Sequence, residues 1–109
     1  MTVRLTYFTY TDEARLTNIK NGDTREAAAK AAVESAGGKL LGFYGLIGAD
    51  ADVMIITDME QTDYMGVVGK ILLGGAAASI HTVTCYTGEQ LGTAMAKATG
   101  TAIDYEPAG

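Results

Sequence analysis

The feature that most constrains the fold is a turn-rich segment in mid-chain, Gly48-Ala49-Asp50-Ala51-Asp52, which leads directly into an apolar run. That run, Val53-Met54-Ile55-Ile56, is dominated by β-branched residues. Glycine and aspartate favour tight turns, whereas β-branched residues favour strands. The segment therefore predicts the link between two successive strands. On both sides of this segment the sequence has the pattern of a strand followed by a helix. This symmetry limits the chain to a small set of folds.

Four segments have the composition of strands, being rich in Val, Ile, Leu, Thr and aromatic residues: Val3–Thr11, Lys39–Ile47, Val53–Thr57 and Ile80–Tyr86. In the first, large apolar side chains occur at both odd and even positions from Tyr7 onward. Because successive side chains point to opposite faces, this predicts a strand covered on both faces. Phe8 and Tyr10 indicate that the sheet face away from the helices is apolar and meets a partner.

Helices are predicted between these strands. A short helix is expected over Asp12–Asn21, and an alanine-rich one follows as far as Ala36, with Asp23 and Glu26 as its capping box. A third spans Gln61–Leu73, and a last one begins after Thr87, with Gln90 at the capping-box position, and runs to about Ala98. The order βαββαβ plus a terminal helix predicts an α+β ferredoxin-like sandwich with helices on one face of an antiparallel sheet.

Composition narrows the classes of function. The 109 residues predict one domain over residues 1–100, followed by a tail over 101–109. A formal net charge of −5 without a basic run gives no electrostatic basis for nucleic-acid binding. The single cysteine excludes an intrachain disulfide and a closed cysteine zinc site, and favours a cytoplasmic location. The apolar run Ile71–Ile80 is too short to span a bilayer, so no membrane association is expected.

The chain resembles the GYD-domain family of dimeric α/β barrels, over roughly residues 3–98. The resemblance lies in these elements: Tyr10-Thr11, Asn18-Ile19-Lys20, Arg25, Gly37-Gly38-Lys39, Gly42-Phe43-Tyr44, the turn from Gly48 to Asp52, Thr82, Thr84 and Tyr86-Thr87. It implies a ferredoxin-like chain that assembles as a homodimer or a higher homo-oligomer. Related dimeric α/β barrels include cofactor-free monooxygenases, isomerases, decarboxylating enzymes, haem-degrading enzymes and small-molecule-sensing domains, so the resemblance implies a range of functions rather than one.

The signature segment departs from the family pattern. The family's Gly-x-Tyr-Asp places its tyrosine at Asp50 in an ungapped match, with Ala51 at the aspartate. With one residue inserted, Asp52 becomes the family aspartate and Ala51 replaces the tyrosine. The signature tyrosine is absent from this chain in both alignments, and the choice between Asp50 and Asp52 stays open.

His81, the only histidine, is the main candidate for acid–base chemistry because an imidazole ordinarily titrates near neutral pH. The alternative is a solvated or hydrogen-bonded histidine at a strand edge. Cys85 lies four residues further along the same strand, about 13 Å away, which excludes a direct pair with His81. Cys85 is better interpreted as a small buried apolar residue.

The other candidate site residues are tyrosines and charged residues. Tyr44 and Asp52 complete the predicted catalytic set with His81, and the residues predicted to bind substrate are Tyr7, Tyr10, Arg15 and Lys20. Tyrosine rings suit a pocket for a planar molecule but serve equally in cores and interfaces. Aspartates in this position also shape turns, and the cations Arg15, Lys20 and Arg25 could bind a carboxylate or simply form a solvated helix face.

Two functions are compatible with these residues. The first is a small-molecule enzyme without a redox cofactor, which oxygenates an aromatic or carbonyl metabolite or moves a proton on it through His81. The second is a non-catalytic module that binds a metabolite or acts as an oligomeric scaffold. No cofactor is expected in either case. In the tail, the spacing of Ile103 and Tyr105 predicts an extended segment that packs across a partner subunit, with a disordered terminus as the alternative.

Overall fold

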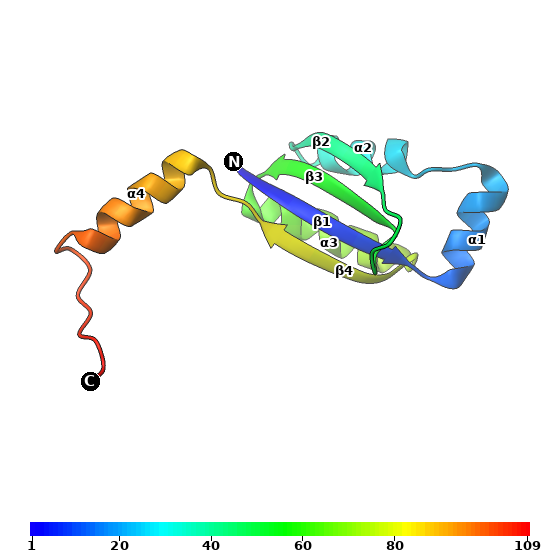
Figure 1. The fold of residues 1–109 in the computed structure, drawn as a ribbon. Helices are drawn as coiled ribbons and strands as arrows, with labels where there is room; N and C mark the ends of the chain where they lie inside the picture. The colour runs from blue at the N-terminus through cyan, green and yellow to red at the C-terminus, as the bar shows by residue number, and fades with distance from the viewer.

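The computed structural model describes residues 1–109 and contains four strands and four helices (Figure 1). In chain order these are β1 (Thr2–Tyr10), α1 (Asp12–Asn21), α2 (Glu26–Ser35), β2 (Lys39–Gly45), β3 (Val53–Met59), α3 (Gln61–Gly74), β4 (Ala77–Thr84) and α4 (Gly88–Thr99). The order predicted from the sequence is confirmed. The main difference is that β4 begins at Ala77, three residues before Ile80, because a bulge opposite Thr9 and Tyr10 extends its pairing with β1.

The strands form one sheet in the order β2-β3-β1-β4, and every neighbouring pair is antiparallel. This order places β1 and β3 in the centre, although β1 begins the chain. Helices connect β1 to β2 and β3 to β4. Of these, α2 and α3 cover the same face of the sheet, whereas α1 lies beyond the end of β1 (Figure 1). The fold is therefore the α+β ferredoxin-like sandwich predicted from the element order.

The covered face of the sheet carries the even-numbered residues of β1 and the odd-numbered residues of β3. Phe8, Val53 and Ile55 form one buried apolar cluster there, and Met59 packs in a second cluster against α2 and α3. The expectation that Phe8 and Tyr10 belong to the face away from the helices is therefore wrong, since Phe8 is buried beneath them and Tyr10 packs against the same cluster. Both sides of β1 carry apolar groups, so alternation alone did not distinguish the two faces.

A polar layer lies beneath α3 at the other end of the covered face. Arg4 is buried there, packs its guanidinium over the Tyr64 ring and donates to the Met59 carbonyl at 3.1 Å. The Tyr64 hydroxyl bonds to the hydroxyls of Thr6 at 2.7 Å and Thr82 at 2.5 Å. Because buried polar groups cost free energy unless they are paired, these bonds fix α3 against β1 and β4.

The N-termini of three helices are fixed by side chains close to them in the sequence. Thr87 and Gln90 form the predicted capping box at the start of α4. At α2 the predicted box is wrong: Asp23 accepts from the Arg25 amide at 2.8 Å, and Arg25, with φ of 69°, is itself the residue before the helix. At the start of α3, the backbone amides of Thr62 and Asp63 donate hydrogen bonds to the Glu60 carboxylate, and these bonds hold the pKa of Glu60 below its usual value.

The last helix, α4, projects away from the rest of the chain (Figure 1). The Cα radius of gyration is 17.9 Å, against about 13 Å expected for a compact domain of this length. All residues of α4 and of the segment after it are exposed. None of the four helices has the length and apolar character needed to cross a membrane.

Candidate functional site

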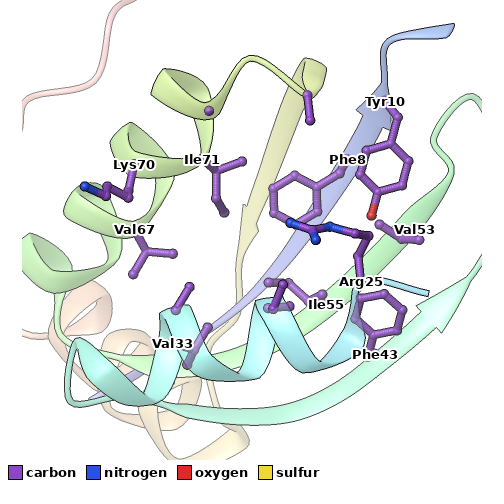
Figure 2. Close-up of a pocket in the computed structure, with 15 residues that line it drawn as sticks. Phe8, Tyr10, Arg25, Val33, Phe43, Val53, Ile55, Val67, Lys70 and Ile71 are labelled. Atoms are coloured by element: carbon purple, nitrogen blue, oxygen red, sulfur yellow. The ribbon is translucent and has the colours of Figure 1, made fainter. Parts of the chain in front are cut away.

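A cavity of about 270 Å³ lies between the covered face of the sheet and helices α2 and α3 (Figure 2). Twelve of its fifteen lining residues are hydrophobic. Aromatic rings of Phe8 and Phe43 line it from the sheet, while Ala28, Ala29 and Ala32 line it from α2. The small side chains of α2 leave this space open, because alanine fills little of the gap between a helix and a sheet.

Two charged side chains, Arg25 and Lys70, border the cavity, together with the hydroxyl group of Tyr10. The Arg25 side chain extends over it, and the Tyr10 hydroxyl points toward the same end, whereas the ammonium group of Lys70 points away (Figure 2). Burial raises the pKa of Tyr10, while the charge of Arg25 acts in the opposite direction. The cavity thus has a long apolar body and one end with a cation and a hydroxyl donor.

Arg25 holds an unusual backbone conformation at this end. It is the only residue other than glycine with a positive φ. Its Nη1 donates to Asp23 at 3.1 Å, and both side chains are close to half-exposed. A guanidinium has five N–H donors, so this ion pair leaves others free to bind an anionic group.

Asp52 is the centre of a separate polar cluster at the end of β1. Its carboxylate accepts from the Arg15 side chain at 3.0 and 3.2 Å and from the Tyr10 amide at 2.9 Å. Arg15 also pairs with Asp12 at 2.7 Å. The hydrogen bond from Arg15 holds the pKa of Asp52 below its usual value. Asp52 therefore ties the β2–β3 turn to the start of α1.

This cluster predicts an acid-dependent contribution to stability. The lowered pKa means that folding is favoured by ionised Asp52 above the unfolded pKa of about 3.9, and that the contribution is lost as pH falls through the folded value. Asp52→Asn is expected to lower the free energy of unfolding by about 1 kcal/mol at pH 7. Urea denaturation should show this difference shrinking in acid. Asp50→Asn is the control; an equal loss in it would contradict a specific role for Asp52.

The uncovered face of the sheet brings three predicted site residues into one row. Tyr44 pairs with Met54, Met54 with Tyr7, and Tyr7 with His81, so the row crosses all four strands. The rings of Tyr7 and His81 lie 6.2 Å apart. Tyr44 and His81 are three strands apart, about 14 Å at the usual strand spacing.

The Tyr44 ring lies over Gly42. A Cβ atom built on Gly42 would come within 2.9 Å of Cε2 of that ring and 3.3 Å of Cδ1 of Ile56. The Tyr44 ring therefore occupies space that a side chain at position 42 would take.

An open groove of about 480 Å³ adjoins the His81 end of this row. Tyr7, Asp50, Ser79 and His81 all line it. His81 itself is exposed and has no side-chain hydrogen bond. Lys20, in the last turn of α1, is exposed and makes no ion pair.

The predicted residues therefore fall into two groups rather than one site. Tyr7, Tyr44 and His81 share the uncovered face, whereas Tyr10, Arg15 and Asp52 meet at the end of β1. Sequence reasoning missed the cavity, whose signal was the alanine-rich segment before Ala36: its small residues were interpreted only as helix formers. Arg25, one of the cations that the sequence offers for binding a carboxylate, lies at the end of this cavity.

The comparisons with known proteins concern the fold and the family. Among solved structures, the chain is similar to a MhuD variant with two manganese protoporphyrin IX molecules bound per active site, with 14% sequence identity and a TM-score of 0.43. The similarity covers 81% of this chain and 95% of that one. No curated protein matches the chain. The family model of the GYD domain matches residues 5–95, so the chain belongs to the GYD-domain family.

Proposed function

We propose that the protein binds a small amphipathic molecule in the cavity between the sheet, α2 and α3. The observation that carries this proposal is the apolar cavity with Arg25 and the Tyr10 hydroxyl at one end. An apolar cavity of about 150 Å³ holds benzene, so 270 Å³ suits a body of about two fused rings. The cation at one end favours a carboxylate or a similar anionic group on that body.

Binding is proposed ahead of catalysis because of what the cavity contains. Its lining residues include no histidine, carboxylate or cysteine, and its titratable groups are Tyr10, Arg25 and Lys70. A general base that works near neutral pH needs a pKa in that range. The arrangement thus supports the non-catalytic alternative. The apolar lining would select the ring body of the ligand, and Arg25 would select its negative charge.

The test is a calorimetric titration with naphthoate, compared with naphthalene methanol as a neutral analogue of the same shape. We expect the wild-type protein to prefer naphthoate and Arg25→Gln to lose about tenfold or more in naphthoate affinity, because a charge-assisted hydrogen bond contributes about 1.5–3 kcal/mol. Lys30→Gln, on the outer side of α2, makes the same charge change and should bind like the wild type. Equal affinity of all three proteins for both compounds would contradict the proposal.

A second candidate function is proton transfer at the uncovered face. The observation that favours it is that Tyr7, His81 and Asp50 line one groove, where the rings of Tyr7 and His81 lie 6.2 Å apart. In this hypothesis His81 takes the proton of a carbonyl compound, while Tyr7 and Tyr44 orient an aromatic substrate along their row.

Deuterium exchange at the α-carbon of an aromatic ketone, followed by NMR, tests this second function. A positioned general base accelerates such a step by about 10²–10⁴. His81→Asn should therefore remove the acceleration while the far-ultraviolet circular dichroism stays unchanged. If the wild-type protein exchanges the ketone no faster than free imidazole at equal concentration, His81 has no role as a catalytic base in this reaction.

A further inference from the structure

The backbone of Arg25 has a conformation that arginine does not favour. Its φ of 69° and ψ of 3° lie in the left-handed region, where the Cβ atom of any residue other than glycine is crowded. Arg25 also directly precedes the first turn of α2, yet its side chain makes no capping hydrogen bond there. Small polar residues are the usual choice at that position. Neither the turn nor the helix start therefore accounts for an arginine here, and such strained positions cluster at ligand clamps.

One carboxylate holds both the backbone and the side chain of Arg25. Oδ1 of Asp23 accepts a hydrogen bond from the Arg25 amide at 2.8 Å, and Oδ2 accepts one from Nη1 at 3.1 Å. The bond from the amide, followed by that from the side chain, holds the pKa of Asp23 below its usual value. Because the carboxylate binds the backbone and the tip of the same residue, it closes a ring that few arginine rotamers satisfy.

Asp23 is itself fixed to the end of α1. Its backbone amide donates to the Asn18 carbonyl at 2.9 Å. The preceding residue, Gly22, ends α1 with a φ of 61°, and its amide donates to the carbonyls of Asn18 and Ile19. This left-handed glycine lets the chain turn back onto the last turn of the helix. The Asp23 carboxylate thus extends from a backbone that is anchored to α1.

The guanidinium that Asp23 holds lies over the polar end of the cavity (Figure 2). Asp23 is not among the residues that line the cavity, so it holds Arg25 from outside and leaves the space to the ligand. A guanidinium has five N–H donors, and the bond to Asp23 uses one of them. A long side chain that is ordered before binding loses less entropy when the ligand arrives.

We propose that Asp23 is the positioning residue that gives the cavity its preference for anionic ligands. This inference rests on the proposed function and adds the residue that makes Arg25 effective. The carboxylate has two opposing effects: its charge repels an anion, while its bonds keep the guanidinium ordered over the cavity. The ordering prevails because both side chains are close to half-exposed, where water and salt screen the repulsion.

Asp23→Asn separates these two effects. The asparagine oxygen still accepts from the Arg25 amide and keeps the turn, but an amide nitrogen replaces the oxygen that accepts from Nη1. Calorimetric titration should show naphthoate affinity falling about three- to fivefold, the range for a half-exposed ion pair, although a negative charge has been removed. Affinity for naphthalene methanol should stay unchanged. Glu26→Gln removes the same charge on the other side of Arg25 and should bind naphthoate at least as tightly as the wild type.

Two outcomes of this titration would overturn the proposal. Unchanged or tighter naphthoate binding by the Asp23→Asn protein would show that Asp23 only competes for Arg25. An equal loss for both compounds would show that Asp23 only shapes the cavity. A wild-type protein that prefers naphthoate while Asp23→Asn binds it equally well refutes the role of Asp23 alone, whereas a wild type without that preference refutes the proposed function and this inference with it.

Nitrogen-15 relaxation of the Arg25 side chain tests the positioning without any ligand. The order parameter of the Nε–H bond should lie above about 0.6 in the wild type and in Glu26→Gln, and below about 0.6, in the flexible range, in Asp23→Asn. The backbone order parameters of α2 should be the same in all three proteins. Equal side-chain mobility in the wild type and Asp23→Asn would overturn the proposal, whatever the protein binds.

Discussion

Replacing Met59 by alanine is expected to lower the free energy of unfolding by about 2–5 kcal/mol, the range for truncating a buried methionine. Met59 has no exposed surface and packs in the cluster formed by Val33, Tyr64 and Val67. A Cβ atom built on Gly38 would lie only 2.4 Å from Cγ of Met59, so the backbone next to β2 closes tightly on this side chain. The truncation therefore leaves a cavity in a region with little room to adjust.

Urea denaturation measures this difference, and Met65→Ala is the matched control. Met65 lies on α3, a few residues after Met59, and is 60% exposed, so the same substitution should change the unfolding free energy by no more than about 0.5 kcal/mol. Similar losses in the two variants would show that the packing under α3 does not depend on Met59.

Placing a tryptophan at Ala29 is expected to abolish ligand binding, with at least a hundredfold loss of naphthoate affinity. Ala29 lines the cavity from α2, and an indole at this position would fill much of its 270 Å³. Because the indole would enter an apolar cavity that is already present, the fold should be retained. The free energy of unfolding should therefore rise or show only a small decrease.

The control for this variant is Ala27→Trp, the same substitution at an exposed position on α2. The two proteins should have matching circular dichroism, and only Ala29→Trp should lose binding in the calorimetric titration. Retained naphthoate binding in the Ala29→Trp protein would place the ligand outside this cavity, whatever the behaviour of the Arg25→Gln variant.

The element order and the topology could be predicted because each depends on local patterns. The turn before Val53 predicts where β3 begins, and the capping box at Thr87 predicts where α4 begins. The end of β3 was not predicted, because the strand continues from Thr57 to Met59. The two faces of β1 could not be assigned in this way, since Phe8 and Tyr7 are both large and apolar. Only the position of α2 and α3 decides that Phe8 is buried.

The candidate site was less predictable because it is an empty space, which depends on where large side chains are missing. The cavity exists where Ala28, Ala29 and Ala32 are too small to fill the space above Phe8 and Phe43, and a sequence pattern does not show an unfilled space. The positive φ of Arg25 depends on the turn before α2. By contrast, the row through Tyr7, Tyr44 and His81 follows directly from strand register once the sheet order is known.

Gly42 gives the uncovered face a property that no side chain could supply. The Tyr44 ring, which is 56% exposed, occupies the space that a methyl group at position 42 would take. Any larger residue there would turn this ring to another rotamer and move its hydroxyl to another part of the edge strand. The absence of a single carbon atom thus sets where the aromatic ring of β2 rests.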